Sequence, residues 1–484
     1  MRLTSRGLLL GLGGILALRL LAMAMMPFAD TSEPRYAEIA RLMAATGDWI
    51  TPWFEPGEPF WGKPPLAFWV QALSIRLFGL SELAVRLPSW LAMLGVLALV
   101  HRCARQLRGE QAARWATLLF ATMLLPYASA GAVLTDAFLA LGITLSMVSF
   151  LLAPRDPRPL WRYGFFVGLV IGLLSKGPLA LALTAGAMVP WMLWHRNGRA
   201  QLRALPWAAG IALTLTLALP WYIAAELKTP GFLRYFIVGE HILRFVDPGW
   251  QGDRYGSAHQ RPYGSIWLDW LLATMPWGLA WLGLLLWPRR DDPLRRRVAT
   301  AARDPDLTYL LAWGLATPAF FTLSGNILWT YVLPALPPVA LALGMQAAQW
   351  RAARPAGLIL AGMALAPTAA LVLALLAWVQ PAHYKTEKQL VRRAEAAMRA
   401  DDRLYFVGSR PFSARYYSRG TAGLVDDPQA LAAVLPAAGQ RVFLAVRKRE
   451  ATTLLATWGG RVTPLYSSRR YILLQVTGEG ATAP

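Results

Sequence analysis

Long apolar runs separated by short clusters of arginine constrain this chain more than any other feature. A bilayer core about 30 Å thick needs roughly 20 apolar residues per helix, and the runs have this length. Only 15% of the residues are charged, whereas an average globular chain has about 25%. This composition excludes a disordered chain, a collagen and an ordinary soluble enzyme. The sequence therefore predicts a polytopic α-helical membrane protein.

The lengths of the apolar runs predict about eleven spans. The predicted spans are 7–26, 83–104, 112–130, 133–153, 162–176, 178–194, 204–225, 264–287, 307–323, 327–349 and 355–379. A Lys-Gly-Pro triplet at 176–178 divides the stretch 162–194 into two spans, because glycine and proline together interrupt a helix.

The arginine clusters predict the orientation, since cytoplasmic loops are enriched in Lys and Arg. The segment 66–80 is short for a span and contains Gln71 and Arg76, so we expect it to lie on the membrane surface. With that assignment the basic clusters between spans all face the cytoplasm, the N-terminus is cytoplasmic and the C-terminus is outside. A cleaved N-terminal signal sequence is the alternative for the first span, and it would leave this topology unchanged. The net charge of +21 is spread over these clusters, so no nucleic acid partner is expected.

The composition changes near residue 381. A charged helix-like stretch is followed by three short β-like runs at 403–407, 442–446 and 471–476. The chain therefore divides into a transmembrane domain at 1–380, with outer loops at 27–82 and 226–262, and a small α/β domain at 381–484 on the outer face.

Acidic and basic residues meet on the predicted outer face. Asp136 lies within apolar sequence, where an ionisable group is costly and usually marks function. Lys176 lies at an outer turn between two spans. Carboxylates beside Lys and Arg at a membrane surface suit transfer of a group from a lipid phosphate, because the cations neutralise the leaving phosphate. A carboxylate then takes a proton from the acceptor or stabilises charge at a sugar carbon.

An ordered set of motifs resembles the bacterial aminoarabinose transferases. The set consists of 30–39 (DTSEPRYAEI), 47–52 (GDWITP), 63–66 (KPPL), Thr135-Asp136, 176–178 (KGP), 220–222 (PWY), 230–232 (PGF), Glu240-His241, Arg244-Phe245 and 330–334 (TYVLP). Those enzymes are polyprenyl-phosphate-dependent glycosyltransferases of the GT-C type, related to the protein O-mannosyltransferases. The similarity runs from about residue 25 to 345, and it places the chain in the bacterial inner membrane with its active site and C-terminal domain in the periplasm.

The resemblance implies roles for eleven residues. The predicted catalytic acids are Glu33, Asp136 and, second to Glu33, Asp30. The predicted ligands of the donor phosphate are Arg35, Lys63, Lys176 and Tyr331. The predicted substrate-binding residues are Tyr36, Glu240, His241 and Arg244.

The chain departs from the family pattern at three positions. Ser32 stands where the first acid of an Asp-Glu pair is usual, so Asp30 becomes its candidate replacement. Gly62 precedes Lys63 where Glu is usual, and Asn326 stands where Lys is common. The changes at Gly62 and Asn326 bear on the sugar and the acceptor more than on the reaction type.

The predicted reaction is inverting transfer of a sugar, aminoarabinose-like or another pentose or hexose, from a polyprenyl phosphate to a lipid A-like glycolipid. Protein O-mannosylation is the alternative among enzymes, and a carrier of lipid-linked sugars is the alternative from another class. Carriers commonly show internal repeats and charges near the midplane, which this sequence does not clearly show. No metal-ligand spacing occurs and Cys103 is the single cysteine, so no cofactor is required, while a bound divalent cation stays open.

Overall fold

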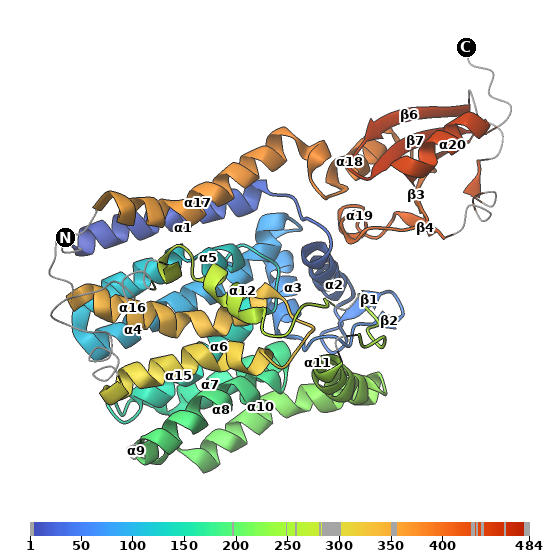
Figure 1. The fold of residues 1–484 in the computed structure, drawn as a ribbon. Helices are drawn as coiled ribbons and strands as arrows, with labels where there is room; N and C mark the ends of the chain where they lie inside the picture. Colours follow the sequence, from blue (N-terminus) through green and yellow to red (C-terminus); the bar gives the residue numbers. More distant parts are fainter. Residues whose placement is uncertain are drawn as a thin grey trace.

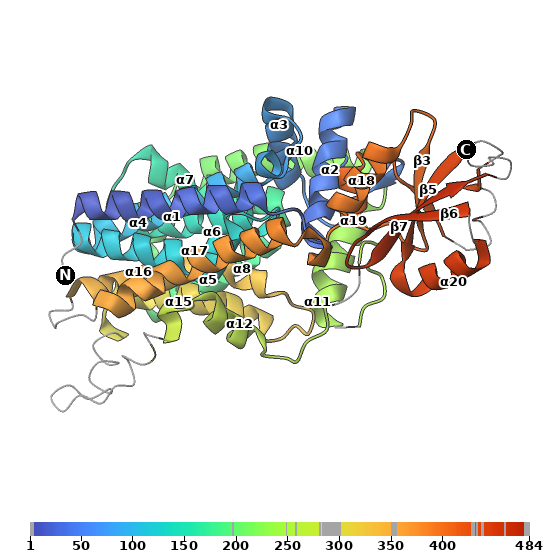
Figure 2. The same ribbon diagram turned by 90° about the horizontal axis from the view of Figure 1, so that it is seen from above.

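The computed structural model describes residues 4–279, 282, 302–349 and 356–478, with gaps at 196–197, 248, 257–258, 427–430, 432–433, 437–439 and 459–460. An elongated helical bundle carries a small sheet domain at one end (Figures 1 and 2). The sheet domain, the short helix α2 and the small β1–β2 ribbon lie at the same end of the bundle. We call this the loop end.

The bundle is made of helices of very different lengths. Its longer helices are α1 (Ser5–Met25), α4 (Glu82–Thr122), α6 (Asp136–Leu152), α7 (Pro159–Lys176), α8 (Leu179–Trp194), α10 (Trp207–Lys228), α15 (Pro305–Phe321), α16 (Leu336–Gln349) and α17 (Ala356–Val379). Its shorter helices are α5 (Leu124–Ser129), α9 (Gly198–Ala204) and α12 (Ile266–Ala273). Helices α1 and α17, from opposite ends of the chain, lie side by side in both views.

Five helical segments among the described residues are long and apolar enough to cross a membrane. They are α1, α4, α10, the segment Trp329–Gln349 and Gly357–Val379 within α17. Shorter apolar helices occupy Leu66–Phe78, Asp136–Leu152 and Leu179–Trp194. The chain is thus a helical multi-pass membrane protein, as its apolar runs predict.

Several predicted span boundaries shift in the structure. Arg108 and Gly109 are not helical, so α4 consists of two helices, as the separate spans 83–104 and 112–130 predict. The prediction of one unbroken helix over 112–130 is wrong, because the chain leaves helical geometry at Met123 before α5 begins. The predicted span 133–153 begins as a helix only at Asp136. The predicted span 264–287 is helical over Ile266–Ala273, and part of it lies outside the described residues.

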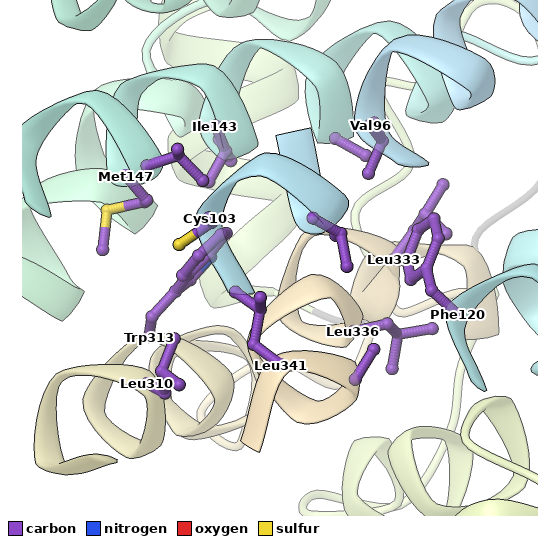
Figure 3. Packing of buried hydrophobic residues seen from close by; sticks show 14 of the residues in the cluster. Val96, Cys103, Phe120, Ile143, Met147, Leu310, Trp313, Leu333, Leu336 and Leu341 are labelled. Carbon is purple, nitrogen blue, oxygen red and sulfur yellow. The ribbon is translucent and has the colours of Figure 1, made fainter. Parts of the chain in front are cut away.

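The core of the bundle is built by α4, α6, α15 and α16 (Figure 3). Cys103, Phe120, Met147, Trp313 and Leu333 are among its buried side chains, and Figure 3 shows them converging from these helices and from the turn before α16. The buried indole of Trp313 is paired, since its Nε1 donates to the carbonyl oxygen of Pro334 at 3.0 Å. Van der Waals packing of this kind holds helices together where lipid removes the hydrophobic drive.

Helices α6 and α7 approach each other closely through glycine. A Cβ built on Gly142 would lie 2.7 Å from the carbonyl oxygen of Gly168, so a larger residue would separate the helices. Small residues commonly permit such contacts between membrane helices. The contact matters for the site because α6 begins at Asp136 and α7 ends at Lys176.

The loop end holds the segments between the long helices. It contains α2 (Ser32–Thr46), β1 (Trp53–Glu55), β2 (Glu58–Pro59), α3 (Leu66–Phe78), the π-helix η1 (Arg234–Leu243), α11 (Arg244–Val246), the 3-10 helix η2 (Trp329–Ala335) and the 3-10 turn η3 (Pro381–His383). Helix α3 forms within the segment 66–80 and is 13 residues long, which is short for a membrane span. It packs beside α2, and Arg76 donates to the carbonyl oxygen of Ala44.

The C-terminal domain is a five-stranded mixed sheet with helices around it. Its elements are α18 (Lys388–Ala397), β3 (Arg403–Val407), α19 (Phe412–Tyr417), β4 (Gly423–Val425), β5 (Arg441–Arg447), α20 (Lys448–Trp458), β6 (Val462–Ser467) and β7 (Tyr471–Thr477). The strand order is β4-β3-β5-β7-β6, with β3 parallel to β4 and β5, and β7 antiparallel to β5 and β6. The three strands predicted from the sequence are confirmed, and β4 and β6 are additional strands.

Candidate functional site

A cavity of about 250 Å³ lies at the loop end of the bundle. Its walls come from α8, the end of α15, η1, α11, η2 and the loop before α3. The lining residues are Lys63, Lys176, Pro178, Leu179, Ala182, Glu240, His241, Arg244, Phe245, Phe320, Phe321, Ser324, Asn326 and Tyr331. Six of the eleven residues singled out in the sequence therefore line one cavity, although they come from segments up to 268 positions apart.

Glu240 joins two cations of the cavity lining. Its carboxylate lies 3.1 Å from Lys63 Nζ and 3.1 Å from an Arg244 nitrogen. Burial would raise the pKa of Glu240, but the charges of Lys63 and Arg244 outweigh burial and hold the pKa at about 2. Glu240 is therefore ionised at neutral pH and orients both cations toward the cavity.

The π-helix η1 sets the position of Glu240 and His241. π-Helices are rare and frequently occur at functional sites. His241 Nδ1 lies 2.7 Å from the carbonyl oxygen of Phe236, and its Nε2 lies 2.9 Å from the carbonyl oxygen of Lys176. Burial lowers the pKa of His241, against the opposing effect of these two carbonyl groups. The imidazole therefore ties η1 to the end of α7.

Gly177 makes the turn after α7 possible. Its φ is +66°, and a Cβ at this position would lie 2.6 Å from the Phe236 ring. Any other residue would strain the backbone and collide with η1. Gly177 thus ends α7 directly after Lys176.

Asp136 and Lys176 form a buried ion pair beside the cavity. The distance from Asp136 Oδ1 to Lys176 Nζ is 2.7 Å, and each residue is 5% exposed. Asp136 is in the first turn of α6 and Lys176 in the last turn of α7, where the helix dipoles favour a negative and a positive charge respectively. The Lys176 ammonium also lies 4.4 Å from the centre of the Tyr331 ring. Lys176 thus faces the cavity with Asp136 behind it.

The lining of the cavity combines polar and apolar side chains. The lining contains three cations, Lys63, Lys176 and Arg244, and one carboxylate, that of Glu240. The apolar lining comes from α8, Phe245 and the two phenylalanines at the end of α15. This combination can hold an anionic headgroup and the first part of an apolar chain.

Arg35 and Tyr36 lie outside the lining of the cavity. Arg35 donates to the carbonyl oxygen of Tyr255 and lies over the ring of Phe412. Tyr36 is 9% exposed and packs between the Phe60 and Phe68 rings. The structure places Tyr36 in the apolar core of the loop end, although the sequence predicts that it binds substrate.

Glu33 is bound by an arginine that the sequence analysis did not single out. The side chain of Arg86 is almost completely buried, and its Nε and terminal nitrogen lie 3.1 and 2.8 Å from the two Glu33 oxygens. Arg86 also donates to the carbonyl oxygens of Met23 and Met26, and the backbone N–H of Val133 donates to Glu33. The sequence does mark Arg86, because a charged residue near the start of a predicted span usually has a function.

Asp30 contacts the C-terminal domain. Its two oxygens accept hydrogen bonds from the Ser413 N–H at 2.8 Å and the Ser413 hydroxyl at 2.6 Å, and Arg470 donates to it as well. Arg470 also lies 2.9 Å from Glu387, so two carboxylates share one guanidinium. We call Asp30, Glu387, Ser413 and Arg470 the domain latch. Three of its four residues lie in the C-terminal domain, and no motif in the sequence predicts that they meet.

We expect Asp30→Asn to loosen the C-terminal domain. The change removes one charge from a buried pair and weakens the hydrogen bonds from Ser413, at a cost of about 1–3 kcal/mol because Arg470 is partly exposed. Differential scanning fluorimetry of the purified protein measures this loss. The control is Asp401→Asn, an exposed change in the same domain, and equal shifts in both variants would contradict the prediction.

Glu387 predicts a pH dependence of stability. Burial raises its pKa above the ordinary value of 4.5, against the opposing effect of Arg470. Because the folded state binds the proton more tightly, the stability from Glu387 is fully present below about pH 4.5 and is lost as the pH rises through the raised value. The unfolding temperature should therefore fall over this window in the native protein and fall less in Glu387→Gln. An identical pH profile for Glu387→Gln would rule this out, and Glu395→Gln on the exposed face of α18 is the control.

Within the described part of the chain, no three His, Cys, Asp or Glu residues are grouped so as to hold a metal ion. Cys103 is buried in the bundle core.

Comparisons with known proteins agree with the motifs. The family model for dolichyl-phosphate-mannose-protein mannosyltransferases matches residues 24–236. The undecaprenyl phosphate-alpha-4-amino-4-deoxy-L-arabinose arabinosyl transferase of Aeromonas hydrophila is 33% identical over 68% of this chain and 57% of its own length. The corresponding transferase of Edwardsiella ictaluri is 32% identical over 72% of this chain and 61% of its own length. The chain thus spans less than two thirds of these curated relatives.

Solved structures show the same fold. ArnT from Cupriavidus metallidurans bound to undecaprenyl phosphate superimposes with a TM-score of 0.76 at 18% identity, with both chains fully covered. The apo form of that protein gives a TM-score of 0.73 at 19% identity, covering 96% of this chain and 97% of the other. The fold is therefore that of a GT-C-type membrane glycosyltransferase.

Within that class, the resemblance drawn from the motifs is confirmed. The chain is a relative of the bacterial aminoarabinose transferases and shares the fold of ArnT.

Proposed function

We propose that the chain transfers a sugar from a polyprenyl phosphate to an acceptor at the outer face of the bacterial inner membrane. The observation that carries the proposal is a cavity whose lining combines three cations with apolar side chains. The relatives named above use an undecaprenyl phosphate-linked aminoarabinose according to their names, which supports the same donor class here. The basic clusters support a cytoplasmic N-terminus and a periplasmic loop end.

The donor phosphate binds among Lys63, Lys176 and Arg244. Each lysine has three N–H donors and arginine has five, so these cations can hold a phosphate in addition to their present carboxylate partners. The two phenylalanines at the end of α15 and the apolar side chains at the start of α8 contact the first isoprene units of the donor. The polyprenyl chain of the donor enters the cavity sideways from the bilayer, and its sugar points toward η1 and the loop before α3.

The reaction breaks the bond between the anomeric carbon and the phosphate oxygen. An acceptor oxygen attacks that carbon from the opposite face, so its configuration inverts. Polyprenyl phosphate leaves with one more negative charge than it carries in the donor, and the three cations stabilise this charge as it develops. Lys63, Lys176 and Arg244 therefore bind the transition state more tightly than the donor.

The acceptor decides whether a base is needed. A lipid A phosphate is already ionised and attacks without losing a proton. A hydroxyl acceptor would have to give its proton to a carboxylate, and Glu33 and Asp136 are the candidates that the resemblance implies. The proposal takes a lipid A-like glycolipid as the acceptor, and transfer to protein is the alternative that fits the mannosyltransferase family model.

The test is transfer by the purified chain in liposomes. Radiolabelled polyprenyl-phosphate sugar is supplied with lipid A or with a serine- and threonine-containing peptide, and the products are separated by extraction into organic solvent. We expect label in lipid A with release of polyprenyl phosphate. Label that moves between leaflets without transfer to either acceptor would support a carrier and contradict the proposal.

A further inference from the structure

A second hollow lies between α1, α4 and α5, apart from the cavity of the proposed transfer. Its volume is about 30 Å³, which is room for roughly two water molecules. Its lining is apolar except for Arg19 from α1 and the indole of Trp90 from α4. Ile15, Leu16 and Leu94, which also line it, are partly exposed, so the hollow opens between α1 and α4 on the bundle surface.

Arg19 is buried in this hollow with unused hydrogen-bonding capacity. The residue is 6% exposed, one terminal nitrogen donates to the carbonyl oxygen of Ala128 at 2.6 Å, and the guanidinium lies 5.3 Å from the centre of the Tyr127 ring. Its Nε–H has no partner, and neither does Nε1–H of Trp90. Two buried donors that face the same apolar hollow are a costly arrangement without an acceptor.

The backbone makes room for the guanidinium. A Cβ built on Gly131 would lie 2.3 Å from the central carbon of the Arg19 guanidinium, so only glycine fits there. The chain thus leaves space at Gly131 for the buried Arg19 guanidinium.

No carboxylate in the described part of the chain lies within ion-pair distance of Arg19. Arg86 and Glu33 are the two fully charged residues that influence Arg19 electrostatically, and Glu33 is held by two nitrogens of Arg86. Arg19 thus adds a positive charge that the protein does not balance. Buried charges in membrane proteins are normally paired, so this one calls for an anion from outside the chain.

We propose that the hollow binds the phosphate of an anionic phospholipid, with one phosphate oxygen accepting from Arg19 Nε and Trp90 Nε1. Arg19 lies six residues before the end of α1, which is about 9 Å along the helix from the loop end. The long side chain of an arginine at this depth can extend toward the lipid headgroups. The exposed side chains of Leu21 and Leu91, on the same two helices, would contact the acyl chains, which favours a lipid over a free anion.

Native mass spectrometry of the full chain in detergent, titrated with phosphatidylglycerol or phosphatidylcholine, tests the site. We expect phosphatidylglycerol to bind at least tenfold more tightly than phosphatidylcholine, and Arg19→Gln to lose about tenfold of that affinity, as for a lost charge-assisted hydrogen bond. Arg6→Gln removes the same charge from an exposed position on the same helix and should change the affinity less than twofold. Equal loss in both variants would show that only overall charge matters, and it would overturn the proposal.

Trp90→Phe gives a second measurement that keeps the charge and the packing. It should weaken phosphatidylglycerol binding about threefold, and it decides the matter if Arg19→Gln does not fold. Unchanged affinity in Trp90→Phe together with unchanged affinity in a folded Arg19→Gln would refute the site. Millimolar inorganic phosphate should not displace the lipid, and displacement would mean that the hollow takes a soluble anion instead. None of these readouts depends on sugar transfer, so the site stands or falls separately from the proposed function.

Discussion

Lys63→Met is expected to lower the rate of sugar transfer by about 10²–10³-fold, which is the usual cost of removing one group that stabilises a developing negative charge. The fold should survive, because Glu240 keeps its ion pair with Arg244 at 3.1 Å. The loss should appear in kcat as well as in kcat/KM, since the lysine acts on charge that forms during the reaction. Transfer from radiolabelled polyprenyl-phosphate sugar measures both constants.

The matched control is Lys228→Met. Lys228 is also a lysine of the loop end, and it pairs with Asp48 at 2.6 Å outside the cavity lining. The control should retain nearly full activity. If Lys228→Met and Lys63→Met lose activity to the same extent, the cations act through the overall charge of the loop end and not through the cavity.

Arg86→Met is expected to destabilise the protein by about 3–5 kcal/mol. The change leaves the Glu33 carboxylate without its partner and removes hydrogen bonds to the carbonyl oxygens of Met23 and Met26. Removing one member of a buried pair costs this much because the other charge stays buried. Thermal unfolding in detergent, with the variant and the native protein at equal concentration, measures the loss.

The double variant Arg86→Met with Glu33→Met separates structure from chemistry. Replacing both members of a buried pair by apolar residues often restores stability. If Glu33 serves mainly to hold α2 against α4, the double variant should recover most of the stability and keep measurable transfer. A stable double variant without any transfer would instead support the catalytic role that the family pattern assigns to Glu33.

The sequence predicts the bundle and part of the site because both depend on local signals. Apolar runs of about 20 residues identify most helices, and charges inside or beside such runs identify Asp136 and Lys176. Helix dipoles favour the same two positions, since Asp136 is the first residue of α6 and Lys176 is the last residue of α7. The ordered motifs then point to Lys63, Glu240, His241, Arg244 and Tyr331, all of which line the cavity.

What the sequence leaves open depends on contacts between distant segments. Asp30 and Arg470 are 440 positions apart, and nothing in either segment predicts their pairing. The same holds for Arg86, whose partner Glu33 is 53 positions away. Acids that look equivalent in the sequence therefore have different surroundings, with Asp30 in the domain latch, Glu33 in a buried pair and Asp136 behind the cavity wall.

Binding of polyprenyl phosphate to the purified protein tests the central claim most directly, because it isolates the phosphate from the sugar and the acceptor. Equilibrium binding of the radiolabelled lipid should weaken at least tenfold in Lys63→Met and stay within twofold of the native value in Lys228→Met. Undiminished binding by a folded Lys63→Met protein would mean that the lipid phosphate rests elsewhere, and the reaction proposed for this cavity would have to be abandoned.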